Sequence, residues 1–287
     1  MESGRVTVVI PAFNAAASIE RAIRSAQAQL RVPDEIIVVD DGSGDATAEL
    51  AAASGVRVLR QVNAGPGAAR NAGIAASDSE WIALLDADDA WRPNRLTRQL
   101  ASAIPRDVAV VYCGHDMPNQ VTPMPLATAD FAELWDRNRI PTSTVLLRRA
   151  AWEAVGGFDE SRELIGVEDY NLWLRLAHAG WRMVGIQERL VDYQPTEASL
   201  TRQTRRFAQA ELAQVSHIAA QLGLDPELVR AKEFAIYHEY GVEFFFYRDR
   251  AAARHYLREA ARRGPLPWGT RLRFWASHLP FSLPNTT

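Results

Sequence analysis

Three carboxylates crowd one short stretch of the sequence, where Asp86, Asp88 and Asp89 fall within four residues. They directly follow the apolar run 81–85, and a continuous run of this length is typical of a buried strand in a parallel sheet. Crowded carboxylates repel one another, so they need solvent, shared protons or a nearby cation. A hard divalent metal ion with oxygen ligands would supply that cation, whereas a solvated acidic turn is the simpler alternative.

A second acidic pair, Glu168 and Asp169, stands at the start of a predicted helix with apolar residues at 172, 173 and 176. At this position the helix macrodipole favours the ionised form of a carboxylate. Capping of the helix alone would explain the pair, and a functional role remains open beside it.

Polar segments also follow earlier predicted strands. Residues 11–14 come after the first strand and Asp40-Asp41 after the second, and the acidic stretch 86–89 follows a later one. The carboxyl ends of parallel strands lie at one edge of a sheet, and ligands bind just outside them. We therefore expect these segments to converge on one pocket.

A glycine-rich turn over residues 63–67 precedes a further predicted helix. It contains neither G-x-G-x-x-G nor G-x-x-x-x-G-K-[ST], so it matches neither the dinucleotide fingerprint nor the P-loop. Arg70 and Asn71 in the following helix can instead present a cation and an amide to a phosphate or a sugar. An ordinary surface arginine is the alternative interpretation of Arg70.

Strands alternate with helices in the first part of the sequence, which indicates right-handed crossovers and a parallel sheet. The predicted strands cover residues 6–10, where Pro11 stops the strand, 35–39, 56–59 and 81–85. The predicted helices cover 19–30, with Ser18 as N-cap and Leu30 on the apolar face, 46–53 and 68–76. Further along we predict strands over 108–112 and 143–147, and helices over 150–155 and from 168 onward.

From residue 202 the pattern changes to helices only, so we predict an α/β domain over 1–202 and a helical region over 203–287. The segment 265–284 combines tryptophans with arginines and could lie as an interfacial helix on an anionic membrane. Packing of its aromatic residues against the preceding helices or a partner subunit is the alternative.

The composition fits a large globular protein. The 287 residues carry a net charge of −3 and 47% are hydrophobic, which argues against nucleic-acid binding and disorder. Cys113 is the only cysteine, which excludes an intrachain disulfide and a cysteine-based zinc cluster. The N-terminus lacks a signal-peptide pattern and no apolar run reaches about 18 residues, so we expect a cytoplasmic protein. The 31 arginines against the single Lys232 point to a GC-rich bacterial genome.

Five short motifs in order resemble those of family 2 inverting glycosyltransferases with the GT-A fold. They are Val9-Ile10-Pro11-Ala12-Phe13-Asn14, Val38-Val39-Asp40-Asp41-Gly42-Ser43, Gly67-Ala68-Ala69-Arg70-Asn71, Leu85-Asp86-Ala87-Asp88-Asp89, and Gly157-Phe158-Asp159 followed by Glu168-Asp169. Their order and spacing match over roughly residues 5–202. The resemblance implies a Rossmann-like α/β fold, in which helices flank a mostly parallel central sheet, with a C-terminal α-helical appendage.

The resemblance also implies a sugar donor that carries a nucleoside diphosphate, namely UDP, GDP or dTDP. The residues expected to bind this donor are Pro11, Ala12, Phe13, Asn14, Asp41, Arg70, Asn71, Asp86, Ala87 and Asp88. The base would lie near Phe13 and Asp41, and the ribose and diphosphate near Asp86 and Asp88. Asp88 would be the chief ligand of a divalent metal, Mn²⁺ or Mg²⁺, which neutralises charge on the leaving group.

By the same resemblance, Asp169 would be the general base that deprotonates the acceptor hydroxyl, and Glu168 would help to orient the acceptor or the base. The acceptor would be a saccharide or a lipid-linked molecule in bacterial polysaccharide or glycolipid assembly. A lipid-linked acceptor would suit peripheral contact of residues 265–284 with the inner face of the cell membrane.

One departure from the family pattern concerns the segment after the acidic helix, where Thr196 occupies the position of a usual histidine. A nucleotide-sugar-binding protein without turnover is therefore an alternative. A haloacid-dehalogenase-like phosphotransferase is a second alternative, since it also uses a strand that ends in D-x-D. That family expects Thr or Val where this sequence has Ala90, and it places the motif near the N-terminus.

Overall fold

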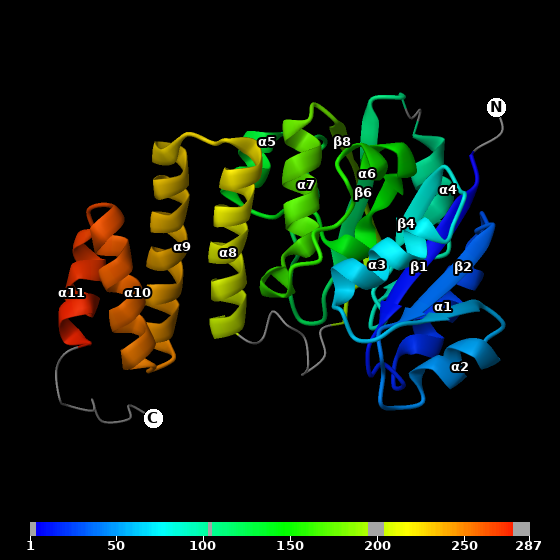
Figure 1. Cartoon of the computed structure of the whole chain (residues 1–287), viewed down its shortest axis with the longest axis horizontal. Coiled ribbons are helices and arrows are strands. Elements are labelled where there is room, and N and C mark those ends of the chain that lie inside the picture. The colour runs from blue at the N-terminus through cyan, green and yellow to red at the C-terminus, as the bar shows by residue number, and fades with distance from the viewer. Residues whose placement is uncertain (1–3, 103–104, 195–203, 278–287) are drawn as a thin grey trace. The chain divides into compact units, whose positions relative to one another are not determined.

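The computed structural model of the chain describes residues 4–102, 105–194 and 204–277. Its internal contacts divide the chain into two compact units, residues 1–202 and residues 203–287 (Figure 1). We call them the N-terminal unit and the C-terminal unit and describe each by itself.

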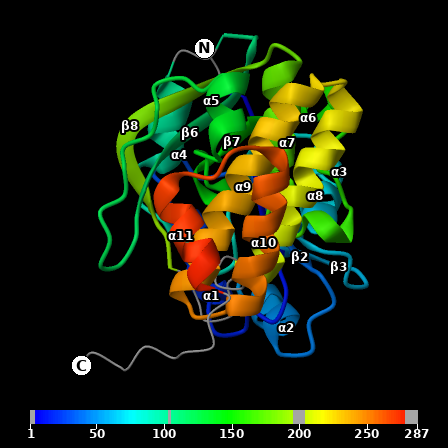
Figure 2. The ribbon, with the colours of Figure 1, turned by 90° about the vertical axis from the view of Figure 1, so that its left-hand side faces the viewer.

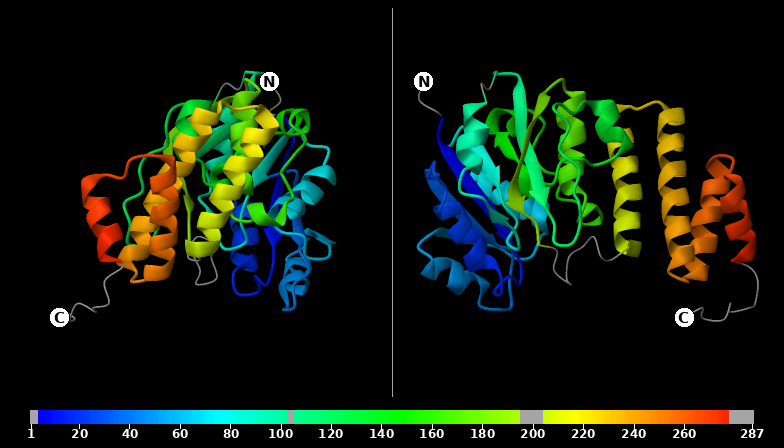
Figure 3. Two further views of the ribbon diagram at one scale, coloured as in Figure 1. Left: turned by 60° about the vertical axis from the view of Figure 1, so that its left-hand side comes forward. Right: turned by 180° about the vertical axis from the view of Figure 1, so that it is seen from behind.

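The N-terminal unit is built around one eight-stranded sheet with the order β3-β2-β1-β4-β7-β6-β8-β5 (Figure 3). Its strands are β1 (Val6–Ala12), β2 (Glu35–Asp40), β3 (Arg57–Arg60), β4 (Trp81–Leu84), β5 (Ala90–Trp91), β6 (Val108–Asp116), β7 (Leu146–Arg148) and β8 (Arg182–Asp192). Its helices are α1 (Ile19–Gln27), α2 (Thr47–Ala53), α3 (Pro66–Ala75), α4 (Arg95–Ala101), α5 (Phe131–Asp136), α6 (Arg149–Ala154) and α7 (Glu168–His178). The strands β1 to β4 are parallel, whereas β7 runs antiparallel to β4 and β6, and β5 antiparallel to β8.

Helices cover both faces of β1, which explains why its residues form a continuous apolar run. Val8 and Ile10 belong to the same buried cluster as Ile23 of α1. On the opposite face, Gly73 of α3 approaches Val9 so closely that a Cβ atom there would lie 2.5 Å from a Val9 methyl carbon. Side chains of successive strand residues point to opposite faces, so both layers of helices pack on one strand.

The strand β1 continues through Pro11 to Ala12, so the prediction that Pro11 stops the strand is wrong. Pro11 pairs in register with Val39, and the carbonyl oxygen of Ala12 accepts a hydrogen bond from Asp41 N at 2.8 Å. Pro11 lies two residues after Val9, so the backbone groups of both residues face the same neighbouring strand. That strand is β4, because the carbonyl oxygen of Val9 accepts a hydrogen bond from Leu85 N. An N–H at residue 11 would therefore face β4 and not β2, and β4 has already ended at Leu84, so Pro11 removes no ladder hydrogen bond.

The second half of the unit departs further from expectation. The predicted strand over 143–147 is a 3₁₀ turn, η1 (Thr142–Thr144), followed by the short antiparallel β7. The long strand β8 was not predicted, because its residues show neither strict alternation nor a continuous apolar run. Leu30 is exposed rather than on an apolar helix face, since α1 ends at Gln27. The predicted fold class, a central sheet flanked by helices, is nevertheless confirmed.

The C-terminal unit contains the helices α8 (Thr204–Leu222), α9 (Pro226–Phe246), α10 (Arg250–Arg263) and α11 (Trp268–Ala276) (Figure 2). The side chains of Asp225 and Asp249 cap α9 and α10, where they accept hydrogen bonds from backbone N–H groups. Gly241 permits close packing of α9 on α10, because an added Cβ would lie 2.7 Å from a Leu257 methyl carbon. Among the described residues, no helix is long and apolar enough to span a membrane.

Candidate functional site

The acidic turn after β4 is held by one serine of the η1 turn. Asp86 N donates a hydrogen bond to Ser143 Oγ at 3.0 Å, and the same hydroxyl donates to Asp89 Oδ2 at 2.5 Å. Asp89 is wholly buried, and its other oxygen accepts from Gln194 N at 3.0 Å. Burial, together with the nearby Asp86, raises the pKa of Asp89 to about 8. Asp89 therefore fixes the shape of the turn, while Asp86 and Asp88 remain partly exposed.

Negative charge is concentrated at Asp86 and Asp88. Burial and the neighbouring Asp86 raise the pKa of Asp88 to about 6. The guanidinium of Arg21, in α1, donates a hydrogen bond to the backbone oxygen of Asp88 and so brings one cation near the turn. Arg70 supplies a second cation, at Asp86, and so reduces the repulsion between these carboxylates.

Arg70, in α3, links the acidic turn to the acidic pair of α7. Its guanidinium lies 2.7 Å from Asp86 Oδ1 and 2.5 Å from Glu168 Oε1, and its side chain is 5% exposed. Burial by itself would lower the pKa of Arg70, but the two carboxylates together raise it above its usual value. Arg70 is therefore a permanently charged bridge between two acidic segments that are far apart in the sequence.

Asp169 is the buried carboxylate of the second acidic pair, at the start of α7. Its Oδ2 accepts a hydrogen bond from Thr142 Oγ1 at 2.7 Å, and its Oδ1 accepts from Tyr170 N at 2.6 Å. Burial and the adjacent Glu168 raise the pKa of Asp169 to about 7, against the opposing effects of Thr142 and Arg70. A carboxylate with this pKa can accept and release a proton near neutral pH.

No functional role was predicted for Thr142 and Ser143 from the sequence, although their hydroxyls form hydrogen bonds with the two acidic segments. The polar side chains of Gln99 and Arg95, both wholly buried in α4, hold the turn from behind. Gln99 Nε2 donates to the carbonyl oxygen of Thr144 at 2.9 Å, and Arg95 Nη2 donates to that of Val145 at 2.8 Å. Three successive hydroxyl residues after Pro141 were the only signal in the sequence.

The end of β1 is tied to the loop after β2. Asn14, with a φ of 50°, donates from its backbone N to Ser43 Oγ at 2.9 Å and accepts from Gly44 N at 2.8 Å. Phe13 lies between Ala12, the last residue of β1, and Asn14, and its ring is 53% exposed. Pro11 precedes Ala12 in the same strand. An exposed aromatic ring at the carboxyl end of a central strand is available to a flat ligand such as a base.

Asp41 lies buried beneath the turn that precedes α3. Its carboxylate accepts hydrogen bonds from the side chains of Gln61 and Asn63, at 2.7 and 3.1 Å. It also accepts from the backbone N of Ala64 and of Gly65, both at 2.8 Å. With each oxygen accepting two bonds, Asp41 shapes this turn, and its contact with a base stays a prediction.

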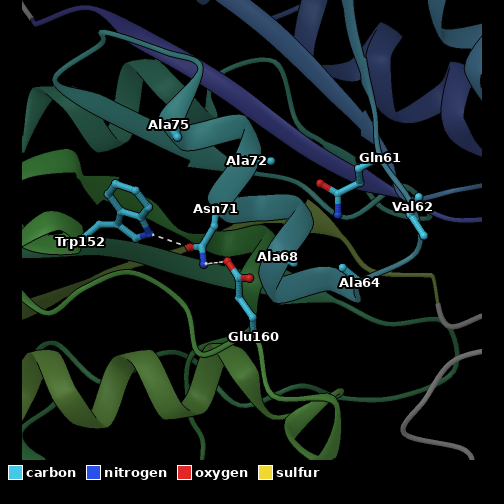
Figure 4. A pocket seen from close by; sticks show the side chains of 9 residues that line it. All are labelled: Gln61, Val62, Ala64, Ala68, Asn71, Ala72, Ala75, Trp152 and Glu160. Atoms are coloured by element: carbon cyan, nitrogen blue, oxygen red, sulfur yellow. Dashed lines mark hydrogen bonds between the residues drawn. The ribbon is translucent and has the colours of Figure 1, made fainter.

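Asn71 faces away from the acidic turn, and the structure does not bring the two together. Its amide pairs with both backbone groups of Phe158 at 2.9 Å and also bonds Glu160 and Trp152. This side of α3 borders an open surface cavity of about 580 Å³ (Figure 4). The lining residues are Gln61, Val62, Ala64, Ala68, Asn71, Ala72, Ala75, Trp152 and Glu160. The cavity is thus separate from the face of α3 that carries Arg70.

Within the described part of the chain, no group of three or more His, Cys, Asp or Glu side chains is arranged to hold a metal ion. The oxygen donors at the acidic turn nevertheless fit a hard divalent ion, provided that a ligand supplies the other oxygens. Mg²⁺ is commonly bound in this way, by one or two carboxylates together with substrate phosphates. The predicted consequence of Thr196 falls outside the described residues.

Two family models match the chain. The one described as Glycosyl transferase family 2 matches residues 7–143, and the one described as Glycosyl transferase family group 2 matches residues 81–284. The second covers well over half of the chain.

Curated relatives include the succinoglycan biosynthesis protein ExoO of Rhizobium meliloti, which is 51% identical over 102 residues. That match covers 34% of this chain and 29% of the relative. An uncharacterized glycosyltransferase of Rickettsia prowazekii, RP339, is 30% identical over 59% of this chain and 58% of its own length. The matches to these two relatives thus span less than two thirds of each.

Two solved structures share the fold. S. aureus TarS in complex with UDP-GlcNAc aligns with a TM-score of 0.63 and 16% identity, over 95% of this chain and 79% of TarS. The mannosyltransferase PcManGT from Pyrobaculum calidifontis, in complex with GDP-Man and Mn²⁺, aligns with a TM-score of 0.64 and 19% identity, over 96% and 80%. With these matches and the motifs at the sheet edge, the chain belongs to glycosyl transferase family 2 and has the GT-A fold.

Proposed function

We propose that this protein transfers a sugar from a nucleoside-diphosphate sugar to an acceptor hydroxyl with inversion, and that Asp169 is the general base. The observation that carries this proposal is the buried Asp169 carboxylate, oriented by Thr142 and with a pKa of about 7. An inverting transfer needs a base that takes the acceptor proton while the oxygen attacks the anomeric carbon. At neutral pH a substantial fraction of Asp169 is ionised and can do so.

Arg70 and Glu168 would align the reacting parts. Arg70 is bonded to Asp86, in the turn where we expect the donor diphosphate, and to Glu168, the neighbour of the proposed base. This bridge supports a fixed separation between the donor and the base. Correct alignment of reactants can supply a large part of a rate enhancement. We assign Glu168 to the orientation of the acceptor.

A divalent metal, Mn²⁺ or Mg²⁺, would be held by Asp88 together with the donor phosphates. When bound, it would stabilise the negative charge that develops on the nucleoside diphosphate as it leaves. Support comes from the partly exposed carboxylates of Asp86 and Asp88 and from the Mn²⁺ in the complex of PcManGT. The exposed ring of Phe13 is the proposed contact for the base of the donor.

The relatives narrow the proposed substrates. The relatives with solved structures bind UDP, UDP-GlcNAc and GDP-Man, which supports UDP or GDP as the donor nucleotide. The proposal also includes dTDP. The relation to a succinoglycan biosynthesis protein supports a saccharide or lipid-linked acceptor in bacterial polysaccharide or glycolipid assembly. We propose residues 1–202 as the transferase domain and the cytoplasm, including the inner face of the cell membrane, as its location.

The test combines binding with turnover. Thermal unfolding is measured with UDP, GDP or dTDP, each with and without Mn²⁺, because a ligand that binds the native state raises its stability. The proposal predicts that one nucleotide stabilises the protein and that Mn²⁺ increases the effect. The corresponding sugar donors are then incubated with the enzyme, and release of the nucleotide is followed. Stabilisation without any release or transfer from the donors would favour a binding protein, and no stabilisation by any nucleotide would contradict the proposal.

A further inference from the structure

The helix α11 exposes three large apolar side chains and buries a small polar one. Trp268, Leu272 and Trp275 are 74%, 52% and 67% exposed, whereas Thr270 and Ser277 are 2% and 0% exposed. At helical spacing, positions 268, 272 and 275 share one face. These three large apolar side chains therefore point outward, whereas Thr270 and Ser277 point toward the rest of the C-terminal unit, which is unusual for a helix of a globular protein.

Specific contacts fix this orientation. Thr270 Oγ1 lies 2.9 Å from His238 Nε2 of α9, and Arg254 Nη1 of α10 donates to the carbonyl oxygen of Ser277 at 2.7 Å. A rotation of α11 that buried the two indoles would break both hydrogen bonds. Figure 2 shows α11, in red, beside α10 and α9. The outward face is thus a stable feature of this unit.

The segment that carries this face is basic in sequence. Residues 250–277 contain seven arginines and one glutamate, a net charge of +6 in a chain whose total charge is −3. No aspartate or glutamate occurs from residue 260 to residue 287. Arg271 is exposed and lies on the same side of the helix as Trp268 and Trp275. The segment therefore combines indoles with a net positive charge, while Glu239 of α9 lies near His238, the partner of Thr270.

We infer that the Trp268, Leu272 and Trp275 face of α11 binds the headgroup region of an anionic lipid bilayer. Tryptophan prefers the membrane interface, and basic residues near it are attracted by acidic lipids. The nine residues of α11 extend over about 14 Å, less than half of the roughly 30 Å hydrocarbon core, so the helix would lie in the surface. A symmetric contact with a second copy is less favourable, since it would bring two such basic regions together.

The test measures flotation of the full-length protein with phosphatidylcholine vesicles, with and without phosphatidylglycerol. We expect binding that depends on phosphatidylglycerol and weakens at high salt. The double variant Trp268→Ser/Trp275→Ser should lower the partition coefficient by at least about tenfold, because two exposed indoles no longer enter the interface. Arg271→Glu should also weaken binding to the acidic vesicles.

The matched control is Leu30→Ser/Val121→Ser, which removes two exposed apolar side chains of the N-terminal unit and should bind vesicles like the wild type. Melting temperatures establish that each variant is folded. Failure of the folded wild type to float, or equal flotation of the tryptophan variant, overturns the inference. So does a wild-type dimer that the tryptophan variant converts to a monomer without any vesicle binding. Nucleotide stabilisation is measured separately, so a failure of the proposed glycosyl transfer leaves this result interpretable.

Discussion

Replacement of Thr142 by valine should shift the pH dependence of sugar transfer. Valine matches threonine in shape but cannot donate the 2.7 Å hydrogen bond to Asp169 Oδ2. That bond favours the ionised carboxylate, so its loss raises the pKa of Asp169. Because the proposed base works only when ionised, activity on the acidic side of the profile should fall at a higher pH than in the wild type.

The size of the shift follows from the strength of the lost bond. A hydrogen bond to a charged group contributes about 1.5–3 kcal/mol, and one pKa unit corresponds to about 1.36 kcal/mol. We therefore expect the acidic limb of kcat/KM to move from its position near 7 upward by about one to two pH units. Other charged groups that face Asp169 are Glu168 and Arg70, and both are retained in the variant.

The assay follows kcat/KM for transfer across the pH range, because this ratio reports the pKa of the free enzyme. Thr142→Ser retains the hydroxyl and should restore the wild-type limb. Thr144→Val is the matched control, since the hydroxyl of Thr144 bonds the carbonyl oxygen of Pro141 rather than Asp169. If Thr142→Val kept the wild-type limb, or if Thr144→Val shifted it equally, the hydrogen bond would not tune the base.

Three further variants test other parts of the site. Asp88→Asn should lose the Mn²⁺-dependent part of nucleotide stabilisation while its own melting temperature stays near that of the wild type; retention of the full Mn²⁺ effect would exclude Asp88 as the chief ligand. Arg70→Met leaves Glu168 buried without its cation and Asp86 without its partner, so the free energy of unfolding in urea should fall by about 3–5 kcal/mol. A fall of less than about 1 kcal/mol would argue against a buried bridge. Asp41→Ala removes the acceptor for four hydrogen bonds and should lower the free energy of unfolding by at least about 2 kcal/mol, whereas wild-type stability would show that the turn before α3 does not depend on it.

The local sequence pattern was sufficient to predict the strand that directly precedes the acidic turn. The run 81–84 is a strand because its side chains are buried, and its neighbour β1 shows the same continuous apolar pattern. The sheet-edge pattern predicted convergence only for residues 11–14, Asp40-Asp41 and 86–89, whereas Glu168 was placed in the same site by the family resemblance. Arg70 joins Asp86 and Glu168, although the sequence alone suggested a cation available to phosphate or sugar, or an ordinary surface arginine.

Other features depend on tertiary contacts that no local pattern encodes. The partners of Thr142 and Ser143 lie 27 and 54 residues away in the sequence, so their hydroxyls carry no local signal of a role. Asn71 sits beside Arg70 in one motif, yet successive helix residues point in different directions, and only Arg70 faces the acidic turn. Similarly, α11 is amphipathic in sequence, but which face is buried depends on its contacts with α9 and α10.

The central claim is tested most directly by the rate of sugar transfer by Asp169→Asn, measured beside the binding of the donor nucleotide. Asparagine keeps the shape of the side chain and cannot accept the acceptor proton. Loss of a general base typically lowers a rate by about a hundredfold to ten-thousandfold. We therefore expect transfer to fall by such a factor while nucleotide stabilisation with Mn²⁺ is unchanged. Transfer at a rate near that of the wild type would contradict the assignment of Asp169 as the base.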